Sequence, residues 1–396
     1  MDRVVIVGGS VAGLTAAETL REDGFAGEIV LINGETHAGY DRPPLSKHVL
    51  SGRMQCSGVA LRPSDFYAQH RMDHRIGVRA AGLDVGRRIV SLDTGASVAF
   101  DALLIATGLR PRPLPGQPAW RGIHMLRTLD DALELRADLL TASRVVVVGA
   151  GFLGSEVVAT ARELGLHVTL IDALEVPMLR QLGGDVGAAV MKTHCDHGVE
   201  MRVRHIVRSF HERDGRVTGV TLDDGEHLTA DVVVVAIGAL PNIEWLAGSG
   251  LEVDDGVVCD EYCRAADGVY AAGDVARWFH PGLGATLRIE HRMHATEQGI
   301  AAARNLLGAR VPFAPLPYFW TDFYDVKIQA FGRIDARDET TILSGQVGAR
   351  SFTAAYHRAG IITAVLGWNA PRKLRSLAAL VGKGVDALSN ATVIAA

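Results

Sequence analysis

The chain has 396 residues, of which 48% are hydrophobic and 21% are charged, the ordinary balance of a folded globular protein. This length is enough for two or three domains with a large core. The 40 basic and 45 acidic residues give a net charge of −5, which argues against nucleic acid as a partner. Asp2 leads almost directly into an apolar stretch, so we expect no signal peptide. No apolar run approaches the roughly 20 residues of a membrane span, and we expect a cytoplasmic protein.

The first apolar stretch predicts a strand over residues 3–8, followed by a helix over 12–22 and a strand over 28–32. The connecting turn is Gly8-Gly9-Ser10-Val11-Ala12-Gly13, with a serine where the second glycine of a G-x-G-x-x-G pattern usually stands. Such a turn holds backbone N–H groups and a helix N-terminus against a pyrophosphate. The expected contacts are Gly8, Gly9, Ala12 and Gly13, with Glu35 binding ribose hydroxyls.

A second, complete fingerprint lies 141 residues further on, from Gly8 to Gly149. It predicts a strand over 144–149, a helix over 152–164 and a strand over 167–171. The strand ends in Asp172, where a carboxylate accepts hydrogen bonds from ribose hydroxyls and repels a 2′-phosphate, so we expect NADH rather than NADPH. The expected contacts are Gly149, Gly151, Phe152, Leu153, Gly154 and Asp172, with Ile237 and Gly238 at the nicotinamide end. Two fingerprints indicate two dinucleotides, most simply a flavin and a nicotinamide.

Two further strand ends carry chemistry. Alternating strand patterns over 76–106 end in Ala106-Thr107-Gly108, and another strand ends in Gly273-Asp274. An aspartate in that place can accept hydrogen bonds from the ribityl hydroxyls of a flavin. A helix expected over 293–307 would point its positive N-terminus at the flavin ring.

The order of these elements predicts an α/β protein with two Rossmann-like dinucleotide-binding domains, as in glutathione reductase, plus a C-terminal α+β domain. Residues 1–112 and 242–313 would form a discontinuous FAD-binding domain. A proline-rich linker near residues 110–115 leads into an NAD-binding domain over 113–241, and residues 314–396 form the last domain.

The four cysteines, Cys56, Cys195, Cys259 and Cys263, form no C-x-x-C pair, and none stands close behind the first fingerprint. This argues against a disulphide reductase. The run His194-Cys195-Asp196-His197 has no second ligand pair at a suitable spacing, so we interpret it as structural and expect no metal.

Several segments together resemble the bacterial FAD-dependent NADH:ferredoxin reductases, which serve Rieske-type dioxygenases and cytochromes P450 and include putidaredoxin reductase and rubredoxin reductase. The resemblance spans essentially the whole chain. It is carried by residues 40–47 (YDRPPLSK), 126–128 (LRT), 149–156 (GAGFLGSE), 237–242 (IGALPN), 272–274 (AGD) and 318–322 (YFWTD).

The resemblance implies site residues for this chain. The implied FAD contacts are Arg42, Pro44, Lys47, Ala80, Ala106, Thr107, Gly108, Arg127, Gly273, Asp274, Glu290, Arg292 and Trp320. Lys47, Glu156 and Trp320 are implied at the junction of flavin, nicotinamide and electron exit. One segment departs from the family pattern Glu-x-Trp-x-Asn-Ala: residues 290–295 read EHRMHA, which bears on the redox potential or on nicotinamide access.

The activity that the resemblance implies is electron transfer from NADH through FAD to a [2Fe–2S] ferredoxin. Because ferredoxins are acidic, basic residues should dock this partner. The candidates are Arg110, Arg112, Lys327, Arg372, Lys373 and Arg375. A rubredoxin reductase, an NADH oxidase-like flavoprotein and a non-catalytic NADH-sensing flavoprotein stay open as alternatives. We expect a monomer or a weak dimer.

Overall fold

The computed structural model describes residues 1–389. It divides into two compact units, and each is assembled from separate stretches of the chain. The first contains Met1–Asp41, Cys56–Arg110 and Ala239–Pro315. The second contains Arg42–Gln55, Pro111–Gly238 and the chain from Leu316 onward.

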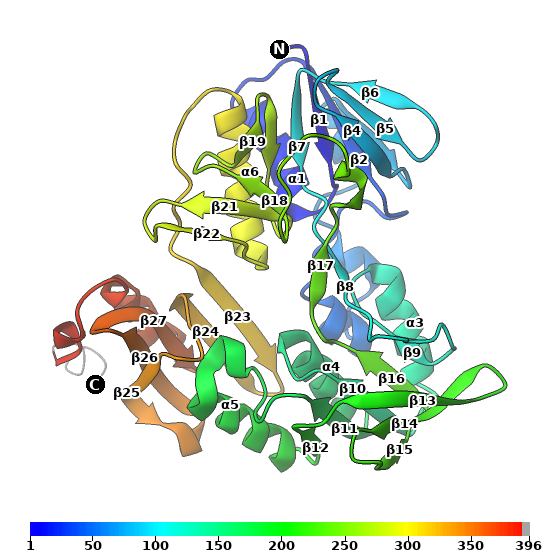
Figure 1. Cartoon of the computed structure of the whole chain (residues 1–396), viewed down its shortest axis with the longest axis vertical. Coiled ribbons are helices and arrows are strands. Elements are labelled where there is room, and N and C mark those ends of the chain that lie inside the picture. Colours follow the sequence, from blue (N-terminus) through cyan, green and yellow to red (C-terminus); the bar gives the residue numbers. More distant parts are fainter. Residues whose placement is uncertain (390–396) are drawn as a thin grey trace. The chain divides into compact units, whose positions relative to one another are not determined.

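The first unit is built on a six-stranded sheet (Figure 1). Its strands lie in the order β19 (Arg264–Ala266), β20 (Val269–Ala271), β7 (Ala102–Ile105), β1 (Arg3–Val7), β2 (Glu28–Asn33) and β3 (Met72–Ile76). All neighbours pair in parallel except β19 and β20. Residues 4–7 of β1 are all buried, as expected of a central parallel strand that is covered on both faces.

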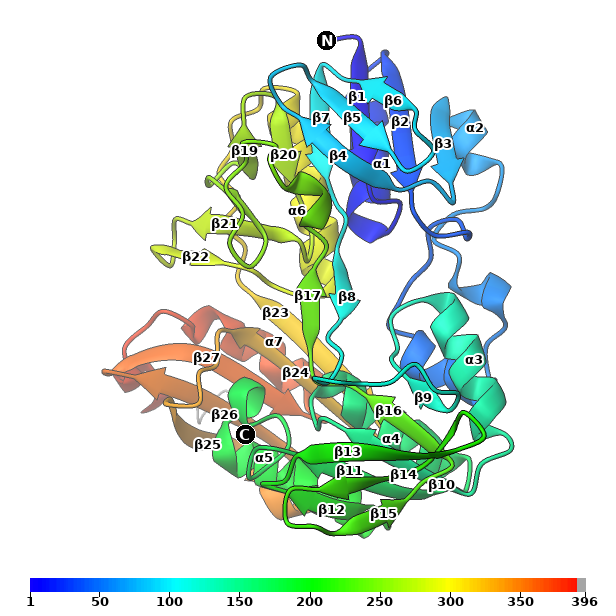
Figure 2. The same cartoon turned by 45° about the vertical axis from the view of Figure 1, so that its right-hand side comes forward.

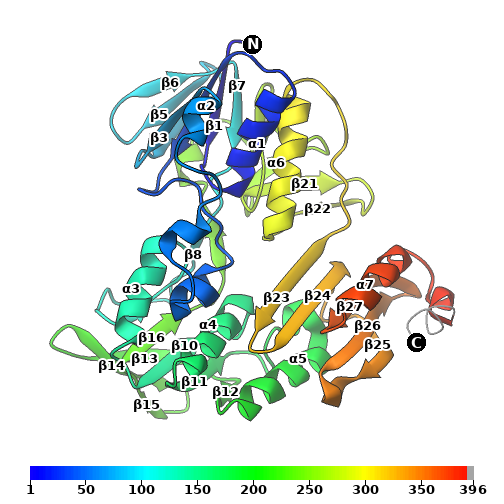
Figure 3. The ribbon, with the colours of Figure 1, turned by 180° about the vertical axis from the view of Figure 1, so that it is seen from behind.

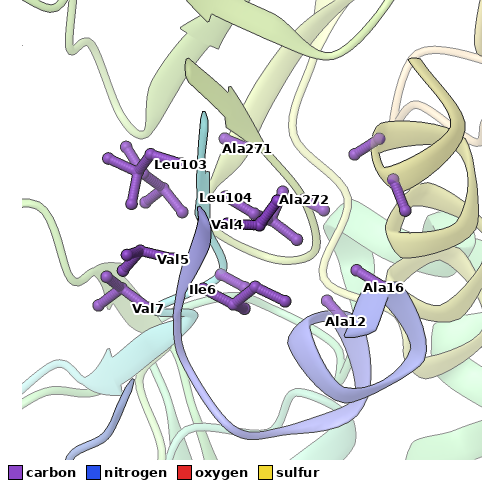
Figure 4. Close-up of a cluster of buried hydrophobic side chains, with 14 of the residues drawn as sticks. Val4, Val5, Ile6, Val7, Ala12, Ala16, Leu103, Leu104, Ala271 and Ala272 are labelled. Atoms are coloured by element: carbon purple, nitrogen blue, oxygen red, sulfur yellow. The ribbon is translucent and has the colours of Figure 1, made fainter. Parts of the chain in front are cut away.

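Two helices of this unit, α1 (Val11–Glu22) and α6 (Arg292–Leu306), lie side by side (Figure 3). A Cβ at Gly299 would stand 2.5 Å from the carbonyl oxygen of Ala12, so a glycine is needed for this close approach. Figure 4 shows Ala12 and Ala16 of α1 beside the apolar side chains of β1, β7 and β20. Small residues on the helix therefore let it pack closely on the sheet.

Smaller elements complete the first unit. One three-stranded antiparallel sheet contains β4 (Ala80–Asp84), β5 (Ile89–Leu92) and β6 (Ser97–Ala99). A second three-stranded sheet is mixed: β18 (Val257–Cys259) pairs in parallel with β21 (Ala276–His280), which pairs antiparallel with β22 (Ala285–Leu287). The unit also contains the short helix α2 (Phe66–Gln69) and strand β17 (Ala239–Pro241), which pairs with β8 (Leu109–Pro111) where the chain leaves this unit.

The second unit repeats the parallel α/β plan with five strands. Their order is β12 (Glu200–Val203), β11 (His167–Asp172), β10 (Arg144–Val148), β16 (Val232–Val235) and β9 (Ile123–His124). Its helices are α3 (Leu129–Leu139), α4 (Phe152–Glu163) and α5 (Leu179–Asp196), and its antiparallel meander is β13 (Val207–Arg213), β14 (Arg216–Leu222) and β15 (His227–Thr229). The valines of β10 and β16 are buried, which explains their uninterrupted apolar sequence.

The last part of the chain adds a five-stranded antiparallel sheet to the second unit (Figure 2). Its order is β23 (Tyr318–Phe323), β24 (Val326–Gly332), β27 (Ile361–Trp368), β26 (Ser351–Arg358) and β25 (Glu339–Gln346), and the helix α7 (Pro371–Leu377) follows. Phe319 and Phe323 join Leu182, Val186 and Val190 of α5 in one hydrophobic cluster. This cluster ties the antiparallel sheet to the parallel one.

The predicted fold class is confirmed, and the helices and strands expected around both fingerprints lie within one residue of their predicted bounds. The boundaries of the two compact units differ from those of the predicted domains. Residues 42–55 lie in the second unit, and the chain from Leu316 onward lies in that unit too. The assignment of cofactor-binding domains therefore stays a prediction, and the end of its last domain falls outside the described residues. Within residues 1–389, no helix combines the length and the apolar character that a membrane crossing needs.

Candidate dinucleotide-binding sites

The first glycine turn is held tightly against the carboxyl ends of neighbouring strands. Gly8 has φ = 122°, and a Cβ there would stand 2.1 Å from the carbonyl oxygen of Ala106, directly after β7. A Cβ at Gly13 would stand 1.9 Å from the carbonyl oxygen of Gly8. Both glycines are thus required by the fold of the turn. At Gly9 a Cβ would meet the side chain of Asn33, the last residue of β2, at 2.9 Å.

The turn at Gly273 and Asp274 lies beside the start of α1. A Cβ at Gly273 would stand 3.0 Å from that of Ala12 and 3.5 Å from that of Ala295 on α6. The Gly273 N–H donates to Oε1 of Gln298 over 2.9 Å. Neither α1 nor α6 carries an acidic residue in its first turn. Two positive helix ends near one glycine turn fit an anionic dinucleotide.

Arg288, which the motif analysis missed, braces this turn. Its guanidinium donates to the carbonyl oxygen of Asp274 at 3.3 Å and to Glu290 at 2.7 Å, and it also reaches Asp255. The side chain is 12% exposed, and burial would lower its pKa, but the two carboxylates outweigh burial and raise it. Only tertiary contacts reveal this role, because no local motif surrounds Arg288.

The segment that departs from the family pattern begins α6. Arg292 is held by Asp41, with 2.9 Å between Nε and Oδ1, and it also donates to the Thr296 hydroxyl. Burial lowers the pKa of His291 to about 4 and that of His294 to about 3, so both histidines are neutral at pH 7. The charge at this helix start is therefore carried by Arg292 and its partner.

Other residues expected at the first site lie in the same unit. Glu35 accepts a hydrogen bond from the Tyr40 hydroxyl. The Thr107 hydroxyl donates to the carbonyl oxygen of Asn242 at 2.8 Å, and the Asn242 amide donates back to that of Thr107 at 2.9 Å. Gly108 has φ = 62°, and Ala80 begins β4.

The glycines of the second turn are needed for two different reasons. A Cβ at Gly149 would stand 2.4 Å from the carbonyl oxygen of Ala236, and one at Gly154 would stand 1.9 Å from that of Gly149. At Gly151 no heavy atom lies within 4 Å of the added Cβ. Protein packing thus explains Gly149 and Gly154, whereas Gly151 leaves open space at the start of α4. That space suits a pyrophosphate approaching the helix N-terminus.

Asp172 lies beside this turn. Its Oδ2 accepts the Ala150 N–H at 2.6 Å, and its Oδ1 accepts the Leu174 N–H at 2.7 Å. A carboxylate offers about four acceptor positions, so two ribose hydroxyls can still bind. Gly238 has φ = 104° with open space at its Cβ position, next to Ile237. Phe152 and Leu153 form the first turn of α4, where Phe152 contacts Phe319 at 5.2 Å between ring centroids.

Lys47 and Glu156 form the centre of a buried polar network in the second unit. The Lys47 ammonium lies 3.0 Å from Oε1 of Glu156 and 2.6 Å from Oδ1 of Asp322. Glu156 also accepts hydrogen bonds from the hydroxyls of Ser46 at 2.5 Å and Thr321 at 3.0 Å. The resemblance singled out both Lys47 and Glu156, and the structure joins them in one ion pair.

The charges of this network have a physical basis. Burial disfavours the ammonium, but Glu156 and Asp322 outweigh burial and raise the pKa of Lys47. Burial raises the pKa of Glu156, and the nearby Lys47 opposes that shift. The three hydrogen bonds that Glu156 accepts favour its charged form, so we take the pair as ionised at neutral pH.

Side chains alternate between the two faces of β23, and this alternation decides which of its aromatic residues are buried in the core. Phe319, Thr321 and Phe323 are buried, whereas Tyr318, Trp320 and Asp322 are half-buried. Trp320 stacks on Tyr318 with 6.1 Å between ring centroids. Trp320 therefore shares the side of the strand that holds Asp322.

Three further residues that the resemblance implies as FAD contacts lie in the second unit: Arg42, Pro44 and Arg127. A helical turn, Leu45–Val49, starts directly after Pro44. The Arg42 guanidinium donates to the carbonyl oxygen of Arg127 at 2.7 Å, and Thr128 caps α3 next to it. The two arginines are thus brought together over a sequence separation of 85 residues.

The histidines and cysteines have structural surroundings. His194 is fully buried beside Phe323 and Tyr324, and His197 stacks on Tyr324 at 3.7 Å. Cys259 and Cys263 are buried free thiols, and burial raises the pKa of Cys263 to about 12. Cys56 and Cys195 are exposed free thiols.

These features define a class of protein: an oxidoreductase that holds two dinucleotides without a redox disulphide. The features are the two glycine turns, the four free cysteines and the Lys47–Glu156 ion pair. Residues 2–299 match the family model described as pyridine nucleotide-disulphide oxidoreductase, and residues 318–394 match the model described as reductase C-terminal. The chain therefore belongs to the pyridine nucleotide-disulphide oxidoreductase family.

Curated relatives narrow the class. The chain is 38% identical to rhodocoxin reductase of Rhodococcus erythropolis, over 88% of this chain and 82% of the relative. It is 39% identical to the anthranilate 1,2-dioxygenase system ferredoxin–NAD(+) reductase component of Burkholderia cepacia, over 89% and 87%. The solved covalent putidaredoxin reductase–putidaredoxin complex matches with a TM-score of 0.93 and 32% identity, over 98% of this chain and 95% of that one. The resemblance to ferredoxin reductases is thus confirmed.

Proposed function

We propose that this protein is an FAD-dependent NADH:ferredoxin reductase whose acceptor is a [2Fe–2S] ferredoxin of a cytochrome P450 or Rieske dioxygenase system. The observation that carries the proposal is the pair of glycine turns, each at the start of a helix whose first turn has no acidic residue. The first turn would hold FAD and the second NADH. Bound FAD supplies the chemistry, since it accepts a hydride and releases electrons singly.

The protein residues have binding and electrostatic roles in this proposal. Asp274 would hold the ribityl hydroxyls of FAD, with Arg288 fixing its backbone. Asp172 would hold the adenosine ribose of NADH, and Gly151 would leave room for its pyrophosphate. Lys47 is a cation fixed by two carboxylates, suited to stabilise negative charge on a reduced ring.

The acceptor would dock on basic side chains. Arg372 and Arg375 are exposed on α7, and Lys327 is exposed on β24. Asn369 joins Lys327 to the start of α7, because its side chain accepts the Lys327 N–H at 2.7 Å and its own N–H donates to the Lys327 carbonyl at 2.8 Å. Arg110 is a weaker candidate, since it already pairs with Glu244. Arg112 and Lys373 belong to the same proposal, as does a monomeric or weakly dimeric state.

The test is NADH-dependent reduction of cytochrome c by the purified flavoprotein, with and without an added [2Fe–2S] ferredoxin. We expect a strong ferredoxin-dependent rate with NADH and little with NADPH. Bleaching of the flavin by NADH without a ferredoxin-dependent rate would contradict this acceptor. Replacing ferredoxin by rubredoxin or oxygen in the same assay would then identify a different acceptor, and a long-lived reduced complex without turnover would indicate a sensor.

A further inference from the structure

A cation reaches the ribose end of the second site from a distant part of the sequence. β11 ends at Asp172, and β12 ends at Val203, its partner in the parallel pairing. Parallel neighbours end at the same edge of a sheet, so the residues that follow them meet. The Arg204 N–H donates to the carbonyl oxygen of Leu174, and the His205 N–H donates to that of Asp172, both at 3.1 Å. Arg204 therefore belongs to the loop that Asp172 begins.

Within residues 1–389, the Arg204 side chain pairs with one residue, Glu175. Its Nη2 lies 2.6 Å from Oε2 of Glu175, which is three residues after Asp172. Arg204 is 71% exposed and Glu175 is 53% exposed, so solvent and a ligand can reach both. The neighbouring Arg202 is occupied differently, because Glu226 binds it through both carboxylate oxygens. Arg204 is thus the exposed arginine of this loop, and its guanidinium could bind a ligand if Glu175 did not hold it.

The charges at the loop favour a nucleotide with a free 2′-hydroxyl. Asp172 and Glu175 contribute two negative charges, and Arg204 contributes one positive charge. A 2′-phosphate would add a dianion next to these carboxylates, and the arginine that could bind it is neutralised by Glu175. Arginine binds phosphate well when its guanidinium is not already paired.

We propose that Glu175 determines nucleotide specificity by holding Arg204 away from a 2′-phosphate, so that this site selects NADH over NADPH. The inference rests on the proposed function, because it assumes that the second glycine turn binds a nicotinamide dinucleotide. Asp172 repels the phosphate directly, whereas Glu175 acts through Arg204. Removal of the Glu175 charge should therefore expose a latent phosphate-binding arginine.

Binding of 5′-AMP and of 2′,5′-ADP, which differ only in the 2′-phosphate, tests this role by titration calorimetry at low salt. The proteins are FAD-loaded wild type, Glu175→Gln, Arg204→Gln and the double variant. Glu175→Gln should bind 2′,5′-ADP about tenfold more tightly than wild type, because the Arg204 guanidinium is released to bind the 2′-phosphate. Binding of 5′-AMP should stay unchanged. The gain should vanish in the double variant, because Arg204 is absent there.

A matched control removes one negative charge from the other end of β12, away from the loop. Glu200 begins β12 and is 66% exposed, so Glu200→Gln should leave both affinities unchanged. A gain for 2′,5′-ADP that persists in the double variant would show simple charge removal and overturn the role of Arg204. An unchanged affinity ratio in Glu175→Gln, with normal 5′-AMP binding, would overturn the inference alone. Failure of wild type to bind either 5′-AMP or NAD+ would overturn the proposed second site and the inference with it.

Discussion

The hydroxyl of Ser46 donates a 2.5 Å hydrogen bond to Glu156, which stands 110 residues later in the chain. The next residue, Lys47, binds the other oxygen of the same carboxylate at 3.0 Å. The short segment of residues 42–55 is thus fixed on α4 by consecutive polar side chains. This arrangement gives Lys47 a defined position and leaves Glu156 without a free oxygen.

Replacing Lys47 with methionine keeps the length of the side chain and removes its charge. Glu156 would be left buried without its ammonium, so we expect the free energy of unfolding to fall by about 3 kcal/mol. Chemical denaturation measures this change. The double variant Lys47→Met/Glu156→Gln should lose clearly less, because the unpaired charge is gone. Equal losses in the single and double variants would contradict a coupled pair. Slower flavin reduction in Lys47→Met would support the proposed electrostatic role.

Two glycines of the second turn should respond differently to alanine. At Gly154 the added Cβ would stand 1.9 Å from the Gly149 carbonyl oxygen, so Gly154→Ala should fold poorly or bind no nucleotide. At Gly151 the Cβ meets no heavy atom within 4 Å, so Gly151→Ala should keep the melting temperature of the wild type. It should nevertheless bind NADH about tenfold more weakly, because the added methyl group would crowd the pyrophosphate. A stable Gly151→Ala variant with normal NADH affinity would contradict this placement of the nucleotide.

Asp172→Ala should weaken NADH binding by about tenfold or more, since charge-assisted hydrogen bonds to the ribose are lost. The FAD content should stay unchanged, because the first glycine turn lies in the other compact unit. Fluorescence titration with NAD+ and the flavin absorbance of the purified protein measure the two effects. Asp172→Asn is a useful companion, because its amide oxygen can still accept the Leu174 or Ala150 N–H. Unchanged NAD+ affinity in both variants would remove Asp172 from the site.

Arg288→Ala should lower the FAD content of the purified protein, because the Asp274 carbonyl and Glu290 lose their shared guanidinium. Arg277 offers a control of the same type on β21, in the small sheet whose strand β22 ends directly before Arg288. It pairs with Asp254, the residue next to Asp255, and within residues 1–389 its side chain makes no hydrogen bond to the Gly273–Asp274 turn. Arg277→Ala should therefore keep its flavin. Equal flavin loss in both variants would indicate general damage to the sheet instead of a specific brace.

The two glycine turns could be predicted from the sequence because the residues that form each turn are consecutive. Gly8 and Gly149 need a positive φ, and the apolar strands before them are continuous. The sequence could not show that Arg204 joins the loop after Asp172, because the strand pairing that brings them together spans about 30 residues of intervening helix and turn. Along the sequence, the first basic residue after Asp172 is Arg180, which lies on α5 and not on the loop.

The ion pair of Lys47 and Glu156 illustrates a second limit. Each residue could be singled out by resemblance, but nothing in either segment encodes their distance, or the presence of Ser46 and Thr321 on the same carboxylate. Only the packing of β23 and the 42–55 segment on α4 creates the network. The role of Arg288 is hidden for the same reason, since its partners Asp274 and Asp255 lie 14 and 33 residues away in the sequence.

Acid should destabilise the second unit through His194. Burial lowers the pKa of this fully buried side chain from 6.5 to about 3. Between these values the unfolded chain binds a proton that the folded chain does not, so the free energy of unfolding falls as the pH drops below 6.5. The loss attributable to His194 is about 2 kcal/mol by pH 5. Denaturation at pH 7 and pH 5 measures it.

The variant His194→Phe should make that difference between pH 7 and pH 5 smaller by a similar amount, because an aromatic ring is kept beside Phe323 while the titrating group is removed. The ring loses its contact with the Tyr324 hydroxyl, 3.3 Å from Nδ1, so stability at pH 7 serves as the reference for each protein. His167 is exposed at the start of β11, so His167→Phe is the surface substitution against which the His194→Phe result is compared. An identical dependence in His194→Phe and wild type would show that His194 accepts its proton in the folded state.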